Sequence, residues 1–168
     1  YKKLGFDGMQ FHDDDVVPSV DVPHDQIVKD AKEMKKVLDG EGLIPEFVAP
    51  RLWEHPQTID GGYTANDPKD REYALERSRK AIDIANIIGT RNIVLWPARE
   101  GFYVNESKDH AVASERFVAA VDMMLNYDKN IRVLGEMKPN EPMDHAYLPT
   151  TGHFLSICYK TVDPKRVG

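Results

Sequence analysis

The segment 132-RVLGEMKPNEP-142 begins as a short apolar run and ends in a carboxylate, an ammonium group and two prolines. Its apolar start predicts a buried strand, because a short apolar run bounded by turn residues is typical of a sheet that is covered on both faces. Pro139 ends the strand, since proline has no N–H to donate to a central ladder. Strand period two then directs Glu136 and Lys138 to one face at the carboxyl end of the strand.

Glu136 and Lys138 have two interpretations when they are considered alone. Burying a carboxylate and an ammonium group costs free energy unless the two pair with each other or bind something else. They therefore form either a structural ion pair or one part of a binding site, and the rest of the chain has to decide between these.

Composition restricts the class of protein. The 168 residues are the length of one domain, and the apolar share of 41% with a charged share of 30% is typical of a globular chain. The net charge of −6 and the lack of a basic stripe argue against nucleic acid as a partner. No apolar run approaches the ~20 residues of a membrane helix. The single cysteine, Cys158, rules out an internal disulfide and favours a cytoplasmic location, and we expect it to be a buried hydrophobic residue.

Apolar periodicity predicts strands that alternate with amphipathic helices, which is the order of parallel βα units. The expected strands cover 6–11, 43–49, 92–96 and 131–136, and the expected helices cover 24–39, 67–88, 108–127 and 151–162. Residues 1–5 look like the last turn of a helix, and residues 166–168 look like the start of a further strand.

Every predicted strand is followed by unusual side chains. They are His12 and Asp15, then Trp53, then Trp96, and finally Glu136 with Lys138. In an open flavodoxin-like sheet, ligands gather at one switch point, whereas in a (β/α)₈ TIM barrel every strand end faces one shared site. The pattern favours the barrel. At roughly 42 residues per unit, eight units need roughly 330 residues, so we expect a single domain over 1–168 with about four of eight strands.

Four motifs together resemble xylose isomerase and its TIM-barrel sugar-isomerase relatives. They are 11-FHDDD-15, 61-GGYTAND-67, Trp96 followed by 99-REG-101, and 136-EMKPNEP-142. The resemblance spans the middle of the family, from the end of its first helix to the start of its sixth strand. It implies a metal-dependent aldose–ketose isomerase that shifts a hydride between C2 and C1 of a small sugar.

The resemblance also implies roles on the sugar-opening side of the site. His12 would contact the ring oxygen and assist ring opening, and Asp15 would orient it. A carboxylate on one imidazole nitrogen fixes the tautomer and leaves the other nitrogen for the substrate. Trp53 and Trp96 would form aromatic walls that bind the sugar and exclude water.

On the other side, Glu136 would be a metal ligand and Lys138 would polarise the carbonyl oxygen. Carboxylate oxygens suit Mg²⁺ or Mn²⁺, with Co²⁺ as a third candidate. The family's other metal ligands follow on later strands, so we expect these 168 residues to be inactive when alone. The full-length protein is expected to be a homo-oligomer, a dimer or a tetramer.

Departures from the family pattern leave the sugar open. Residues 97-PA-98 stand where two glycines are usual, and Met137 stands where proline is usual, while Glu46 and Arg51 add charge. Three alternatives therefore stay open: a sugar epimerase of the same superfamily, a metal-dependent nuclease on a similar barrel, and a fragment with no catalytic activity.

Overall fold

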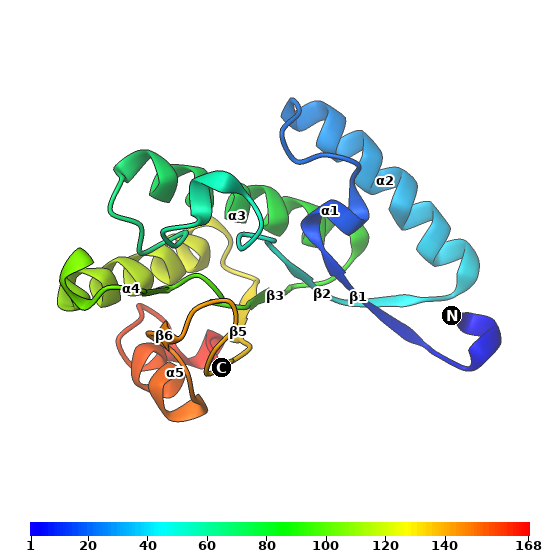
Figure 1. The fold of residues 1–168 in the computed structure, drawn as a ribbon. Helices are drawn as coiled ribbons and strands as arrows, with labels where there is room; N and C mark the ends of the chain where they lie inside the picture. The colour runs from blue at the N-terminus through cyan, green and yellow to red at the C-terminus, as the bar shows by residue number, and fades with distance from the viewer.

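A computed structural model describes all 168 residues. Four parallel strands form one sheet in the order β1-β2-β3-β5, and helices connect them in sequence (Figure 1). The strands are β1 (Gly8–His12), β2 (Ile44–Ala49), β3 (Asn92–Leu95) and β5 (Arg132–Gly135). The α-helices are α1 (Asp13–Val16), α2 (His24–Glu41), α3 (Pro68–Ile88), α4 (His110–Tyr127) and α5 (Thr151–Cys158). The expected alternation of strands and helices is confirmed.

Short elements complete the chain. The 3₁₀ turns are η1 (Lys2–Leu4), η2 (Pro56–Thr58), η3 (Asn105–Ser107) and η4 (Pro164–Arg166). The helical turn expected at the start of the chain is η1, which Gly5 ends in the left-handed conformation with φ of 88°. No helix is both long enough and apolar enough to cross a membrane.

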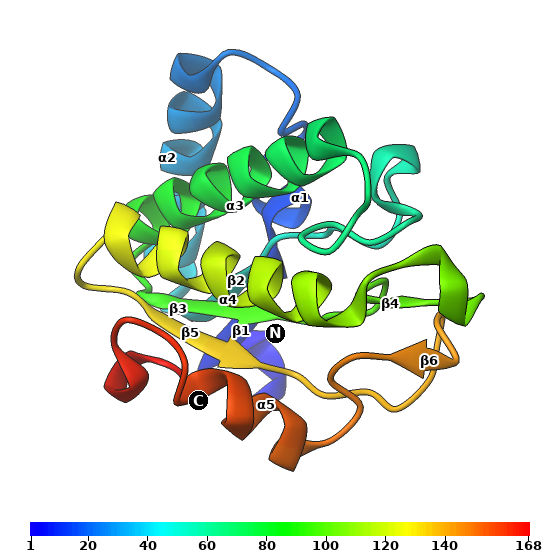
Figure 2. The same cartoon turned by 90° about the vertical axis from the view of Figure 1, so that its left-hand side faces the viewer.

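The three long helices lie on one side of the sheet, and the opposite side of β1, β2 and β3 carries no helix (Figure 2). Side chains between the helices and the sheet are fully buried, and they include Ile27, Ile82, Ile88, Ile93, Val121 and Met124. Cys158 is buried among the same apolar residues, as expected. The long helices cover one face of the sheet, so polar side chains at the strand ends can lie on the other face without packing against these helices.

Helix ends follow local capping chemistry. The Asp67 carboxylate accepts a hydrogen bond of 2.8 Å from the backbone N–H of Lys69, and the proline that follows Asp67 is the first residue of α3. Helix α4 starts two residues later than expected, because Asp109 caps it. Helix α5 ends at Cys158 rather than at residue 162, since the Thr161 hydroxyl bonds back to the Cys158 carbonyl at 2.7 Å.

The bounds of the four strands differ from the expected ones by one or two residues, and the differences at two strands change the argument. Strand β1 starts two residues later than expected, at Gly8, and its ladder with β2 shifts register between Met9 and Gln10, opposite Pro45, which has no N–H to donate. The fourth strand, β5, ends at Gly135 instead of continuing to residue 136. The period-two argument for the directions of Glu136 and Lys138 is therefore wrong, because both lie beyond the strand.

The expected further strand begins at the end of the sequence. Val167 forms a parallel bridge with Val133, and the N–H of Gly168 donates to the Val133 carbonyl at 3.0 Å. This contact is a single bridge at the edge of β5, and Arg166, the first residue of the expected strand, belongs to η4.

A two-stranded antiparallel ladder joins two loops, and the sequence did not predict it. Strand β4 (Gly101–Phe102) pairs with β6 (His145–Ala146). This ladder ties the loop that follows β3 to the loop that follows β5. The contact needs a glycine, because a Cβ at Gly101 would lie 2.3 Å from the His145 carbonyl oxygen.

Candidate functional site

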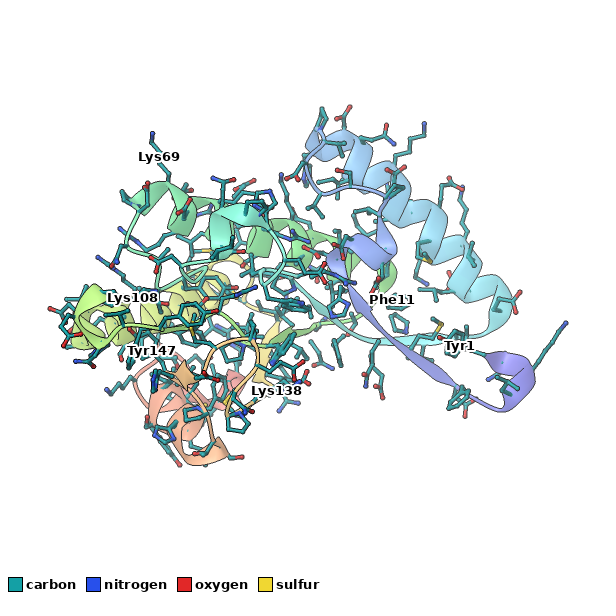
Figure 3. The ribbon with its side chains drawn as sticks, viewed as in Figure 1. Tyr1, Phe11, Lys69, Lys108, Lys138 and Tyr147 are labelled. Carbon is teal, nitrogen blue, oxygen red and sulfur yellow. The ribbon has the colours of Figure 1, made fainter.

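The carboxyl ends of the four parallel strands surround a cavity of about 430 Å³. Its lining comprises Gln10, Phe11, His12, Asp15, Phe47, Ala49, Trp53, Trp96, Glu136 and Lys138. All six side chains singled out in the sequence are in this set. Figure 3 labels Lys138 near the end of β5, away from α2 and α3. The structure therefore brings residues from four separate βα units to one site.

His12 is the last residue of β1, and Asp15 lies within the single turn of α1 that follows. The Asp15 Oδ2 atom accepts the backbone N–H of His12 at 2.9 Å and lies 3.0 Å from His12 Nδ1. Burial raises the pKa of Asp15, but the hydrogen bond from the His12 backbone N–H, the adjacent His12 ring and the positive charge of Arg51 outweigh it and leave the pKa below its ordinary value. Asp15 therefore stays ionised beside the imidazole, whose Nε2 has no partner within the protein.

Aromatic rings form a continuous wall next to His12. The His12 and Trp53 ring centroids are 5.1 Å apart, and those of Trp53 and Trp96 are 4.5 Å apart, both pairs in an edge-to-face arrangement. The Lys138 Nζ atom lies 5.1 Å from the centre of the Trp96 ring, within the range of a cation–π contact. The buried indole nitrogen of Trp96 has no hydrogen-bond partner. The wall therefore places an ammonium group and flat apolar faces along the same cavity.

The ion pair between Glu136 and Lys138, one of the two interpretations of the sequence, does not form. Lys138 instead pairs with Glu141 at 2.6 Å. The backbone N–H of Glu136 donates to the Leu95 carbonyl at 2.9 Å, while its exposed carboxylate has no ion-pair partner. Glu136 thus has a fixed backbone and a free carboxylate at the rim of the cavity.

A metal site is not complete within these residues. No group of three or more His, Cys, Asp or Glu side chains is arranged to hold an ion. Mg²⁺ needs several oxygen donors in a nearly octahedral arrangement, and Glu136 supplies one carboxylate. The 168 residues do not fit a divalent ion on their own.

Arginines hold the aspartate run of the first motif, and sequence reasoning missed both of their roles. The buried Arg77 makes two hydrogen bonds, of 2.7 and 2.9 Å, to the carboxylate of the fully buried Asp13. Arg51 donates to Asp14 at 2.8 Å and to Asp15 at 3.0 Å. A signal was present, because three successive carboxylates after a buried strand need nearby cations, but the sequence does not say which cations.

Glu100 is a second feature that was missed. Its carboxylate is 3% exposed and accepts the backbone N–H groups of Gly62, Tyr63 and Thr64 at 2.9–3.0 Å, together with the Thr64 hydroxyl at 2.5 Å. The sequence did offer one signal, because the segments 61–67 and 99–101 both belong to the motifs that resemble the sugar-isomerase family. Glu100 fixes the loop before α3 against the turn that carries Trp96.

Comparison with known proteins agrees with this architecture. The model of the family described as xylose isomerase-like TIM barrel matches residues 1–168. A D-psicose 3-epimerase crystallised in the presence of D-fructose superposes with a TM-score of 0.68 at 13% identity, over 98% of this chain and 53% of that chain.

Two further solved structures show the same relationship. A 3-keto-D-glucoside 4-epimerase from E. coli has a TM-score of 0.74 at 16% identity, over 99% of this chain and 58% of its own. A xylose isomerase domain protein from Planctomyces limnophilus has a TM-score of 0.63 at 16% identity, over 99% and 54%. The chain thus spans about half the length of these structures, and its four βα units form part of a TIM barrel. The protein belongs to the xylose isomerase-like TIM barrel family.

Proposed function

We propose that these residues form one half of the site of an aldose–ketose isomerase. The observation that carries the proposal is the convergence of His12, Trp53, Trp96 and Lys138 on one cavity, with the imidazole placed 3.0 Å from Asp15. A cavity of about 430 Å³ is within the usual size range of small-molecule sites. The substrate in this proposal is a small sugar.

His12 is the proposed catalyst of ring opening. A cyclic aldose opens when the proton of its anomeric hydroxyl leaves and a proton reaches the ring oxygen. An imidazole in hydrogen-bond reach of both oxygens carries out this transfer, and the contacts of Nδ1 leave Nε2 of His12 for the sugar. Asp15 and Arg51 hold the ring in place.

Lys138 and the tryptophans act on the open-chain sugar. A hydride moves from C2 to the carbonyl carbon C1, the proton of the C2 hydroxyl is lost, and O1 gains a proton, so the overall reaction is redox-neutral. The ammonium group of Lys138 stabilises the negative charge that develops on the carbonyl oxygen. Trp53 and Trp96 exclude water, which disfavours a pathway that exchanges hydrogen with solvent.

Metal binding is also a proposal, and it requires residues in addition to these 168. Glu136 would supply one ligand of Mg²⁺, Mn²⁺ or Co²⁺, and the remaining ligands would come from outside these 168 residues. When bound, the ion would polarise the sugar oxygens as a Lewis acid. A cytoplasmic location and a homo-oligomeric state also stay predictions.

A sugar epimerase is the second candidate, because several of the similar structures are described as epimerases. These likenesses are at 13 and 16% identity and show the fold, whereas the motif around Glu136 and Lys138 resembles that of the isomerases apart from Met137. An epimerase that works by proton abstraction exchanges hydrogen with solvent, whereas hydride transfer keeps it.

The test is a label-transfer assay on the complete natural protein that carries these residues. It is supplied with Mn²⁺ and [2-²H]-aldoses, and the products are followed by NMR. Deuterium at C1 of the ketose supports the proposal, while loss of deuterium to water or inversion at a carbinol carbon contradicts it. His12→Asn should lower kcat by about 10²–10⁴-fold, and the exposed control His24→Asn should not.

A further inference from the structure

Arg51 and Asp15 both contact the same nitrogen of His12. Arg51 Nη2 lies 2.8 Å from His12 Nδ1, and Asp15 Oδ2 lies 3.0 Å from the same atom. Nδ1 has one position in the ring plane for either a proton or a lone pair. It therefore satisfies one of these two neighbours at a time.

The two neighbours require opposite tautomers of the neutral imidazole. Arginine is an obligate donor that stays protonated in proteins, so the contact with Arg51 needs a lone pair on Nδ1 and puts the proton on Nε2. An ionised carboxylate is an obligate acceptor, so the contact with Asp15 needs a proton on Nδ1. The balance between them decides which group His12 presents to the cavity.

Arg51 is the better anchored of the two. Its Nε donates to Asp14 at 2.8 Å, its Nη2 donates to Asp15 at 3.0 Å, and its backbone N–H donates to the buried Asp13 at 3.1 Å. The Arg51 side chain is 22% exposed, compared with 46% for Asp15.

Asp15 does not depend on Nδ1 for its own hydrogen bonds. Its Oδ2 accepts the His12 backbone N–H, and its Oδ1 accepts from Arg51. The more exposed carboxylate is also open to water, which replaces a lost hydrogen bond at little cost. Arg51 Nη2, by contrast, carries two hydrogens, of which one is donated to Asp15 Oδ1. The other has an acceptor within the protein only if His12 Nδ1 carries a lone pair.

We propose that Arg51 is a positioning residue that holds His12 as the Nε2–H tautomer, so that the neutral imidazole presents a hydrogen-bond donor to the cavity. Such a donor binds an acceptor oxygen of the ligand. If the proposed function holds, on which the identity of the ligand rests, that oxygen is the ring oxygen of a cyclic sugar. By holding this tautomer, Arg51 favours cyclic substrates, because the Nε2–H group of His12 binds the oxygen that must gain a proton during ring opening.

The tautomer can be measured without any substrate. Two-bond ¹H–¹⁵N correlation spectra of the ¹⁵N-histidine-labelled full-length protein distinguish Nε2–H from Nδ1–H, and the spectrum of His12→Asn identifies which histidine signal belongs to His12. We expect Nε2–H for His12 in the wild type and in Asp15→Ala, and a change to Nδ1–H in Arg51→Met. The matched control Arg99→Met, which removes a donor to the Trp53 carbonyl, should leave the tautomer unchanged.

Three outcomes would overturn the inference: Nδ1–H in the wild-type protein, a loss of Nε2–H in Asp15→Ala, or an unchanged Nε2–H in a folded Arg51→Met variant. If Arg51→Met does not fold, the wild type and Asp15→Ala still decide, since Nδ1–H in the wild type or a loss of Nε2–H in Asp15→Ala contradicts the role of Arg51. The spectra contain no sugar, so a negative label-transfer assay leaves this result intact. If isomerisation is observed, Arg51→Met should slow turnover of a cyclic aldose and spare that of acyclic glyceraldehyde.

Discussion

Trp53 and Trp96 meet edge to face with ring centroids 4.5 Å apart and planes at 69°, and the chain contains no other tryptophan. Both rings line the cavity. Intrinsic tryptophan fluorescence therefore reports on the candidate site without a background from elsewhere in the chain.

The first prediction uses this property. Titration with xylitol, an open-chain polyol, should change the tryptophan emission in a saturable way, because the polyol replaces water against both rings. Trp53→Phe should reduce the change without abolishing it, and should lower the free energy of unfolding by about 1 kcal/mol through loss of the aromatic pair. Tyr159→Phe, at an exposed ring, is the control. An emission spectrum that does not respond to xylitol would argue against a polyol site here.

The second prediction concerns Glu100. In Glu100→Gln, an amide NH₂ replaces one carboxylate oxygen and faces backbone donors of the 62–64 loop. Since each unsatisfied buried donor costs about 1–3 kcal/mol, the free energy of unfolding should fall by at least about 2 kcal/mol. Hydrogen exchange at Gly62, Tyr63 and Thr64 should accelerate. Glu106→Gln, at an exposed position, should change neither quantity, and equal protection of the loop in both variants would refute the prediction.

The third prediction concerns the buried pair of Arg77 and Asp13. Burial lowers the pKa of Arg77, but the hydrogen bonds and charge of Asp13 more than offset this and leave it above its ordinary value. Arg77→Met leaves a carboxylate that is 0% exposed without its partner, so we expect a loss of about 3–5 kcal/mol in denaturant unfolding. Arg79→Met removes exposed ion pairs and should cost less than about 1 kcal/mol. Similar losses in the two variants would show that the buried pair does not stabilise the fold.

The fourth prediction is a pH effect far from the cavity. Burial, together with the charge of Asp83 and a hydrogen bond to its carboxylate, raises the pKa of Tyr127 from 10.0 to about 12. Because the folded value is the higher one, this stabilisation is complete below pH 10 and is lost as the pH rises toward 12. Burial also raises the pKa of Tyr63, Tyr73 and Tyr147, so the Tyr127 step is identified by difference: absorbance titration should show a late step that is absent in Tyr127→Phe and shifted to lower pH in Asp83→Asn. A titration of Tyr127 that is unaffected by Asp83→Asn would exclude the carboxylate as a cause.

The sequence predicted what depends on neighbouring residues. The start of α3 at 67-DP-68 was placed correctly because a side-chain cap and a proline act within one turn. The burial of Cys158 followed from its place in an apolar helix. The strand ends were placed within about two residues, which was enough to bring the six candidate side chains to one cavity.

What the sequence did not predict depends on partners that lie far apart in the chain. Asp13 and Arg77 are separated by 64 positions, and nothing local to either residue identifies the other. Strands β4 and β6 have two residues each, which is too short for any alternation to be visible. Glu136 and Lys138 line one cavity, as predicted. The prediction assumed that both belong to the strand, however, and β5 ends before them at Gly135.

The β4–β6 ladder has a consequence for engineering substrate preference. The loop over 97–104 follows Trp96 and the loop over 136–148 begins with Glu136 and Lys138, all three of which line the cavity. The ladder joins the two loops by backbone hydrogen bonds, so they form a single exchangeable module. A chimera that takes one loop from a relative would place a foreign backbone against Gly101, where there is no room for a side chain. Loop exchange that aims to change the accepted sugar should therefore transplant both segments together.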